Sequence, residues 1–219
     1  MNPFFFPDWT NRVRLPAGML LAAAPLYLLG VVYYGGSPKT TDVGYAPKQP
    51  IPYSHSLHVG QLGMDCKFCH TTVDKAAFAA IPPAETCIGC HGQTIKAKSP
   101  KLTPLREAYT SVENKPVEWI KVHDLPDYVY FNHSSHVNRG VGCASCHGRI
   151  DNMEVVKQEN TLSMGWCLNC HRNPENHLRP QSEVTNLNWT PNEDQRKLGL
   201  AIKAERGINP PTHCSTCHR

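Results

Sequence analysis

The chemistry-bearing residues of this chain recur in one five-residue pattern, Cys-x-x-Cys-His. It occurs five times, at residues 66–70, 87–91, 143–147, 167–171 and 214–218. Two thiols with a two-residue gap and an adjacent imidazole are typical of c-type haem attachment, in which the thiols become thioethers and the histidine becomes the proximal iron ligand. Since 5 × 2 = 10, the motifs use all ten cysteines of the chain, and the pattern predicts five covalently bound haem c groups.

The motifs define two sets of site residues. The predicted attachment residues are Cys66, Cys69, Cys87, Cys90, Cys143, Cys146, Cys167, Cys170, Cys214 and Cys217. The predicted proximal iron ligands are His70, His91, His147, His171 and His218. Other uses of cysteine fit less well. Zinc sites take Cys-x-x-Cys pairs in twos and give no reason for a histidine after each pair. A disulfide framework does not explain the regular gap, and a thioredoxin-like motif occurs once, in a βαβ setting.

An internal repeat accompanies the motifs. Residues 53–59 (YSHSLHV) are answered by residues 131–137 (FNHSSHV), and both histidines shift by 78 positions. The first and third attachment motifs are 77 positions apart, and the second and fourth are 80 positions apart. Each unit therefore contains His-x-x-His and two attachment motifs. We predict two dihaem units with a fifth haem at the C-terminus.

The His-x-x-His pairs are the best candidates for distal iron ligands. Histidines three positions apart on a helical turn point from one face, so a single turn can serve two neighbouring haems. The fifth ligand is sought among His123, His177 and His213. We favour His123, because it has no counterpart in the first unit. The predicted distal ligands are His55, His58, His123, His133 and His136.

Alternatives for the fifth ligand remain open. His213 abuts Cys214 and can reach only a haem other than its own, and His177 lies in a polar loop typical of the surface. A methionine would instead give one histidine–methionine haem, which has a higher potential than a bis-histidine haem. The candidate methionines are Met64, Met153 and Met164.

Occupied axial positions predict electron transfer without catalysis. An iron with two protein ligands has no open site for a small substrate. The chain has no Cys-x-x-Cys-Lys variant, and scattered carboxylates such as Asp42, Asp65 and Asp124 form no acid–base pair. We therefore predict no catalytic residues and no enzyme activity for the chain by itself.

Composition predicts a fold with little regular structure. Nineteen prolines and 15 glycines among 219 residues disfavour long elements, and aromatic residues are only 8 %. We expect a mainly α, multihaem cytochrome c fold with much irregular structure, in which porphyrins supply part of the core. The formal charge of +4 comes without a basic stripe and does not indicate a nucleic-acid partner.

The N-terminus has the pattern of a membrane anchor. Residues 15–34 form a 20-residue run without a charge, long enough to span the roughly 30 Å hydrocarbon core. Arg12 and Arg14 precede the run, so the positive-inside rule places its N-terminal side in the cytoplasm. A cleaved signal peptide is the alternative, but the run is long for one and no clear cleavage site follows. We predict an anchor at 1–36, a linker at 37–52 and a periplasmic haem domain at 53–219.

A few further elements are expected. Residues 105–112 fit a short helix, and residues 117–122 and 129–131 fit extended chain. Thr190-Pro191-Asn192-Glu193 has the pattern of a capping box with proline at the first helical position. The helix that would follow has a plausible C-cap at Gly207.

With these features the chain resembles the pentahaem cytochrome c subunit of alternative complex III, a bacterial quinol-oxidising respiratory complex. The resemblance covers nearly the whole chain, and the stretch 122–147 is its most specific part. It is carried by Tyr53–His58 with Cys66–His70, His123–Asp127 running on to Phe131–His136, Gly165-Trp166 before Cys167, and the terminal Cys214–Arg219.

The resemblance implies a role and partners. Such a subunit passes electrons along its haems from the quinol-oxidising and iron–sulfur subunits toward a cytochrome c or a terminal oxidase. The implied partners are a molybdopterin-type iron–sulfur subunit, polytopic quinol-binding subunits, a monohaem cytochrome c and the lipid of the inner (cytoplasmic) membrane. One alternative is a membrane-anchored quinol dehydrogenase feeding a periplasmic reductase. In that class the first haem motif usually follows the membrane helix closely, whereas here Cys66 comes about thirty residues after it. The other alternative is a free-standing periplasmic redox protein.

Overall fold

The computed structural model describes residues 7–37, 40–112 and 115–218. The first six residues of the predicted anchor and Arg219, which the resemblance includes, lie outside these ranges. The chain divides into two compact units, residues 1–42 and 43–219.

The described part of the first unit is built on one helix, α1 (Trp9–Gly35). Its 27 residues rise about 40 Å at 1.5 Å each, more than the roughly 30 Å of a hydrocarbon core. The uncharged run 15–34 lies inside it, together with Pro16 and Pro25, and none of its residues is buried. Within the described residues, α1 alone is long and apolar enough to cross a membrane.

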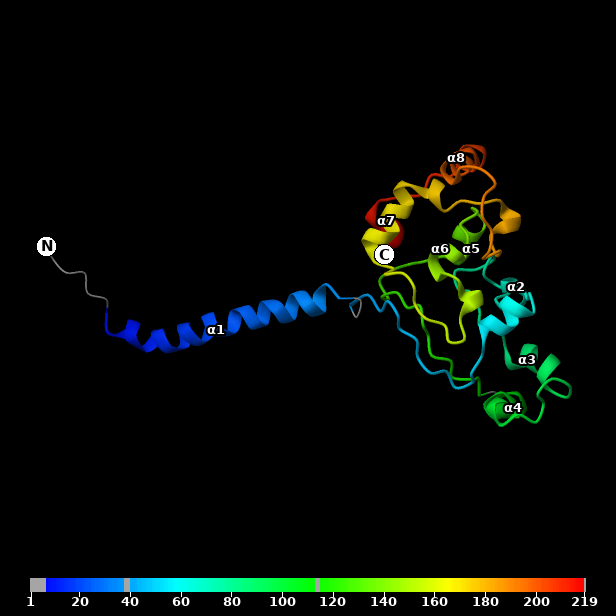
Figure 1. Ribbon diagram of the computed structural model, residues 1–219, viewed down its shortest axis with the longest axis horizontal. Coiled ribbons are helices and arrows are strands. Elements are labelled where there is room, and N and C mark those ends of the chain that lie inside the picture. The colour runs from blue at the N-terminus through cyan, green and yellow to red at the C-terminus, as the bar shows by residue number, and fades with distance from the viewer. Residues whose placement is uncertain (1–6, 38–39, 113–114, 219) are drawn as a thin grey trace. The chain divides into compact units, whose positions relative to one another are not determined.

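The second unit consists of short helices joined by irregular chain (Figure 1). The described residues contain no β-strand, and Val141 and Leu178 form an isolated antiparallel bridge. The expectation of a mostly helical chain with little strand is confirmed. The elements are η2 (Ser56–Gln61), α2 (Cys66–Cys69), α3 (Ala84–His91), η3 (Pro100–Leu102), α4 (Thr103–Thr110), α5 (His133–Val137), α6 (Ala144–His147), η4 (Ile150–Asn152), α7 (Met164–Arg172), η5 (Pro174–Asn176), η6 (Gln181–Glu183), α8 (Gln195–Glu205) and α9 (Cys214–Cys217).

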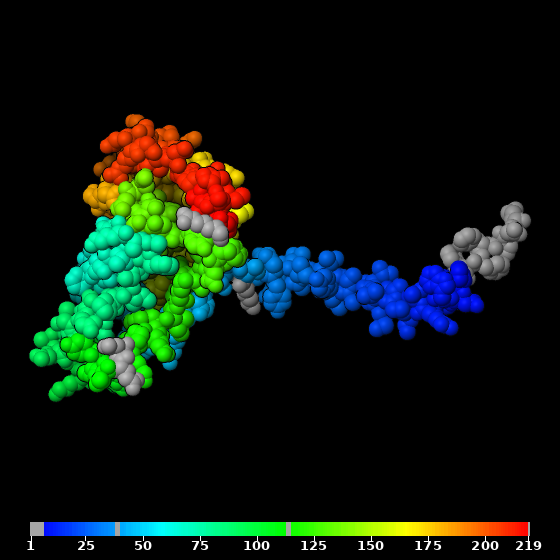
Figure 2. All heavy atoms as spheres, turned by 180° about the vertical axis from the view of Figure 1, so that it is seen from behind, coloured from blue at the N-terminus to red at the C-terminus, as the bar shows by residue number. Residues whose placement is uncertain are grey.

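Helices early and late in the second unit lie at opposite ends of it. Helices α3 and α4 pack together at one end, whereas α8 lies at the opposite end and α7 lies beside the C-terminus (Figure 1). Figure 2 shows the same order from behind, with residues near 90–110 and the C-terminal residues on opposite sides of the unit. The short helix expected at residues 105–112 is α4, displaced two residues toward the N-terminus, and its Leu105 is buried.

The apolar core that the chain itself supplies is small. One cluster contains Val73, Val137 and Val184, and it connects the two repeat units and the segment after them. Leu178, Ile202 and Ile208 form the other cluster under α8. Clusters of this size bury little apolar surface for a domain of this length, which agrees with the expectation that porphyrins complete the core.

Helix α8 is fixed at both ends, but it begins later than the sequence predicts. Asp194 is its N-cap, and the carboxylate accepts a hydrogen bond of 2.9 Å from the Lys197 amide. The expected capping box at residues 190–193 is therefore wrong, because Asp194 is the side chain that caps. The C-cap is Arg206, one residue before the predicted Gly207. Gly207 follows it with φ +58°, and the amide of Ile208 donates to the Lys203 carbonyl at 2.9 Å.

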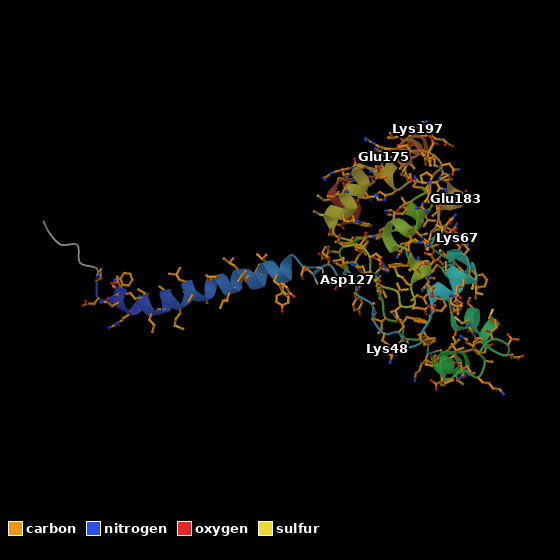
Figure 3. All side chains as sticks on the ribbon, viewed as in Figure 1. Lys48, Lys67, Asp127, Glu175, Glu183 and Lys197 are labelled. Carbon is orange, nitrogen blue, oxygen red and sulfur yellow. The ribbon has the colours of Figure 1, made fainter. Side chains whose placement is uncertain are left out.

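The packing of α8 on η5 leaves no room for a side chain at Gly199. A Cβ there would lie 1.9 Å from the carbonyl oxygen of Glu175. The Glu175 carboxylate is buried beneath α8 (Figure 3), where Lys203 lies 3.7 Å and Arg196 3.9 Å from it. Gln195 donates to the Glu175 and Leu178 carbonyls at 3.0 and 2.8 Å, so main-chain contacts set the separation of the two elements.

We expect Gly199→Ala to push α8 away from η5. Overpacking of this kind costs about 1–3 kcal/mol, and it should lower the thermal unfolding midpoint of the holoprotein by several degrees. Gly165→Ala in α7 is the matched control, because a Cβ at that position meets nothing within 4 Å. Equal midpoints for the two variants would contradict this account.

Candidate functional site

The two His-x-x-His turns have the same three-dimensional arrangement. The first lies at the start of η2 and the second in α5. In each, the preceding aromatic ring, Tyr53 or Phe131, lies edge-on to the first histidine, at 4.8 and 4.7 Å respectively. The same ring stacks on the second histidine, at 4.4 and 4.5 Å. The repeat read from the sequence is therefore also a repeat in side-chain geometry.

Each turn is held by the other repeat unit. The amides of His133 and Ser134 donate to the carbonyls of Ala77 and Ala76, which follow the first motif, at 3.0 and 3.1 Å. Reciprocally, the amide of Ser56 donates to the Met153 carbonyl, which follows the third motif, at 3.0 Å. The two units thus clasp each other.

The clasp around η2 depends on close main-chain approach. A Cβ at Gly60 would lie 2.3 Å from the Asp151 carbonyl oxygen of η4, so only glycine fits. In the second unit, Asn132 is the N-cap of α5, and its side-chain oxygen accepts from the Ser135 amide at 3.4 Å. These contacts fix the direction in which the paired histidines point.

Main-chain carbonyls fix the orientation of seven imidazoles. A carbonyl oxygen only accepts, so the ring nitrogen facing it, Nδ1, carries the proton, and Nε2 keeps its lone pair for a metal. Among the predicted proximal ligands, His70, His91, His171 and His218 donate through Nδ1 to the carbonyls of Ala80, Ile95, Pro211 and Tyr128, at 2.8, 2.7, 2.7 and 3.2 Å. Among the predicted distal ligands, His58, His133 and His136 donate to the carbonyls of Ser54, Ala77 and Asn132, at 2.8, 2.9 and 2.8 Å.

Three pairs of imidazoles have the spacing of axial ligands. Imidazole nitrogen binds a metal at about 2.0–2.1 Å, and the ring centroid lies about 1.1 Å farther, so two axial rings have centroids about 6.3 Å apart. The observed centroid distances are 6.2 Å for His58 with His91, 6.1 Å for His136 with His171, and 6.4 Å for His133 with His147. In each pair a predicted distal ligand faces a predicted proximal one.

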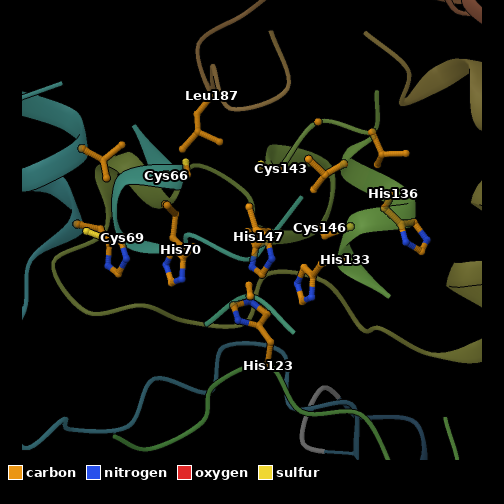
Figure 4. Close-up of a pocket in the computed structure, with 18 of the residues that line it drawn as sticks. Cys66, Cys69, His70, His123, His133, His136, Cys143, Cys146, His147 and Leu187 are labelled. Atoms are coloured by element: carbon orange, nitrogen blue, oxygen red, sulfur yellow. The ribbon is translucent and has the colours of Figure 1, made fainter. Parts of the chain in front are cut away.

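A large cavity opens between the first and third motifs (Figure 4). It holds about 1500 Å³ of empty space, including its open mouth. His70 and His147 line it with the cysteines of their motifs, and His55, His123 and His133 line it as well. Cys167 of the fourth motif also borders this cavity.

Three buried imidazole nitrogens have no hydrogen-bond partner: Nδ1 of His55, Nδ1 of His147 and Nε2 of His123. Burial lowers the pKa of His147 to about 3 and the pKa of His55 to about 4, and neighbouring histidines lower both further. These rings are therefore neutral at pH 7, which is the state that binds a metal. A largely apolar cavity lined by neutral imidazoles and by the cysteines of two attachment motifs fits a metalloporphyrin.

His123 is placed in this cavity by a side chain far away in the sequence. The amide of Gln49 makes two hydrogen bonds to the main chain of Ile120, at 2.8 and 2.9 Å. The His123 ring lies 4.4 Å from the His147 ring, which is shorter than the axial spacing. Its surroundings are thus the first and third motifs.

The fifth motif is held by the segment that leads into α5. The amide of Tyr130 donates to the Cys217 carbonyl at 2.8 Å, and the Tyr128 ring lies 5.7 Å from the His218 ring. His213 is exposed and contacts Thr216 through Nε2 at 2.7 Å. The observed contacts of His123 are with the first and third motifs, so its assignment to the fifth distal position stays a prediction.

The residues present fit covalent haem. All ten cysteines are free thiols, and each pair lies next to its histidine. Among residues 7–37, 40–112 and 115–218, no group of three or more His, Cys, Asp or Glu side chains is arranged to hold a single metal ion. The carbonyl acceptors could not be predicted from the sequence, because they leave no side-chain signal. The aromatic rings of Tyr53 and Phe131 could have been found, because their separation matches the repeat offset of 78.

Attachment pairs, oriented imidazoles and a small aliphatic core together define a c-type cytochrome. Residues 129–219 match the family model described as cytochrome c7 and related cytochrome c. Over 178 residues the chain is 30 % identical to the multihaem cytochrome c subunit of menaquinone reductase from Nitratidesulfovibrio vulgaris, covering 71 % of this chain and 83 % of that protein. The chain belongs to this family of multihaem cytochromes c, and electron transfer with covalently bound c-type haem follows from that membership.

We expect Gly60→Ala to disturb one axial pair. The added methyl group must move η2 away from Asp151, and η2 carries His58, which faces His91. The optical spectrum of the oxidised holoprotein should then gain a high-spin component of up to one haem. Gln61→Ala, an exposed neighbour in the same helix, is the control and should leave the spectrum unchanged. A fully low-spin Gly60→Ala protein would show that the clasp does not set ligation.

Proposed function

We propose that the chain carries five haem c groups, one on each Cys-x-x-Cys-His motif, and passes electrons along them. Each bound haem supplies a one-electron couple. The cysteines of the motifs hold the porphyrins, and the motif histidines provide the proximal ligands. The observation that carries the proposal is the set of three imidazole pairs with ring centroids 6.1–6.4 Å apart. In five of these six rings Nδ1 donates to a main-chain carbonyl, which leaves Nε2 for a metal.

The pairs assign distal ligands within this proposal. His58 serves the second motif, His136 the fourth and His133 the third. The repeat then assigns His55 to the first motif, because His55 is the counterpart of His133 and lines the cavity with His70. His123 is proposed as the fifth distal ligand on the sequence pattern alone, and its ring lies in the cavity of the first and third motifs.

We propose further that α1 anchors the chain in the inner membrane and that residues 53–219 lie on the periplasmic side. Arg12 and Arg14 favour a cytoplasmic N-terminus, and haem is attached to cytochromes c outside the cytoplasm. The linker and the haem domain would then share one compartment with periplasmic redox partners.

The proposed role is that of an electron-carrying subunit in a membrane quinone oxidoreductase, without catalytic residues of its own. The resemblance to the alternative complex III subunit favours electrons leaving quinol for a cytochrome c or an oxidase. Partners would be an iron–sulfur subunit of molybdopterin type, polytopic quinol-binding subunits, a monohaem cytochrome c and membrane lipid. The relative from Nitratidesulfovibrio vulgaris supports the second candidate, a complex that reduces menaquinone.

Extraction in mild detergent tests the assembly. We expect the chain to co-purify in stoichiometric amount with an iron–sulfur subunit and polytopic quinol-binding subunits, with five haems per polypeptide. Quinol-driven reduction of the haems, monitored in the purified complex, supports quinol oxidation; haem-driven quinone reduction alone supports the menaquinone reductase role. Recovery with a single periplasmic reductase would instead favour the quinol dehydrogenase, and recovery alone would favour a free-standing carrier.

Substitution of single histidines tests the ligand set. We expect His123→Leu to convert one haem of five to the high-spin state, because one iron loses its sixth ligand, as read by electron paramagnetic resonance of the oxidised protein. His58→Leu is the positive control with the same expected change. His177→Leu is the matched negative control, since His177 lies outside the predicted ligand set. If His123→Leu leaves all five irons low spin, His123 is not a ligand.

A further inference from the structure

The attachment motifs follow one another in space in a different order from the sequence. We propose that the five haems form a single unbranched wire in the order second, first, third, fourth, fifth, and that electrons are exchanged at its two ends, the motifs 87–91 and 214–218. The proposal deepens the proposed electron-transfer function and rests on it. Neither the sequence repeat nor the comparisons give this order.

The centre of the wire is a junction between the first and third motifs. Consecutive residues tether the two motifs: the Val184 carbonyl accepts from the Cys143 amide at 3.0 Å, and the Thr185 carbonyl lies 4.0 Å from the Cys66 sulfur. The cavity in Figure 4 is shared by both motifs. The two units therefore meet head to head through their first haems.

The second motif joins the first from outside this junction. Tyr53 stacks on His58, which faces His91 of the second motif, and it lies edge-on to His55 in the cavity of the first. The Tyr53 side chain also lies near Cys69 and Cys87, one cysteine from each motif. A single aromatic ring thus lies between the two haem sites.

The fourth and fifth motifs continue on the other side. Trp166 and Cys167 at the start of α7 border the cavity of the third motif. His171 of the fourth motif donates to the Pro211 carbonyl at 2.7 Å, three residues before Cys214. The fourth motif is therefore flanked by the third and the fifth.

Exposure of the cysteines agrees with these ends. Cys90 and Cys214 are exposed, whereas the other eight cysteines are partly buried. They belong to the second and fifth motifs, the two that the proposed order places at the ends. Figure 1 shows α3 and the C-terminus well separated within the second unit. Over one passage a single electron enters at one end from a reduced donor and a single electron leaves at the other to an oxidised acceptor, so the chain undergoes no net change.

Counting magnetic neighbours in the purified full-length holoprotein tests the order. His58→Met replaces the ligand opposite His91 with a thioether, which raises the potential of the second haem, and His136→Met does the same for the fourth. Each protein is poised where only the high-potential haem is reduced and therefore diamagnetic. Electron paramagnetic resonance then counts the oxidised haems whose signals change because an adjacent haem has become diamagnetic and no longer couples to them magnetically.

We expect one changed neighbour for His58→Met and two for His136→Met. The order of the sequence predicts two for both, because the second haem would then lie between the first and the third. Any result other than one and two overturns the proposal. His177→Met is the control and should create no high-potential haem.

A measurement with native ligands covers the case in which a variant fails to incorporate haem. The motifs use all ten cysteines, so Glu107→Cys on exposed α4 gives a unique site for a nitroxide label. The label lies on α4, which packs on α3 of the second motif, so we expect the five label-to-iron distances to increase in the order second, first, third, fourth, fifth. Near-equal distances to the first and third irons would overturn the proposed order, because those two haems would then flank the second. Both measurements use the isolated chain, so they do not depend on which respiratory complex it joins.

Discussion

The structure depends on holding imidazole rings in one orientation, as the proposed ligation of haem iron by two histidines requires. A histidine can bind a metal through either nitrogen, and the carbonyl oxygens facing Nδ1 in seven of these rings select Nε2. Main chain rather than side chain supplies this selection, so short irregular segments have to be placed accurately. Five of the seven carbonyls, those of Ala77, Ala80, Ile95, Tyr128 and Pro211, lie outside helices, where no intrahelical hydrogen bond uses them.

The same constraint explains why the two repeat units are interlocked. The turn with His133 and His136 is fixed by main-chain bonds to the loop after the first motif, and the turn with His55 and His58 by a bond to the loop after the third. Each unit alone would lack a support for its own paired histidines. The aliphatic clusters are small, and further hydrogen bonds, such as the one from Asn138 to the Asp74 carbonyl at 2.8 Å, also join the two units. We therefore expect haem binding and folding of the second unit to be strongly coupled.

Much of the site could be predicted from the sequence, because the attachment residues and candidate ligands are specific residue types at fixed spacing. The motifs, the paired histidines and the repeat offset identify the rings that meet at 6.1–6.4 Å. The helical character, the apolar N-terminal helix and the end of α8 near Gly207 were predictable from local rules. The start of α8 was not, because Asp194 and the capping box four residues earlier fit the same rule and tertiary packing against η5 selects between them. The junction of the first and third motifs was also hidden, since an offset shows that two units are alike but not which faces meet. The surroundings of His123 depend on Gln49, more than 70 positions away, a contact that carries no local pattern.

The central proposal is that this chain holds five haems, each with a histidine ligand on both faces of its iron. Spin quantification of the oxidised native protein by electron paramagnetic resonance, combined with the mass of the intact polypeptide, tests it most directly. The account predicts a mass of the chain plus five covalent haems and five low-spin ferric irons per chain, with no high-spin signal. A high-spin signal amounting to one haem, or a mass with fewer than five haems, would contradict it.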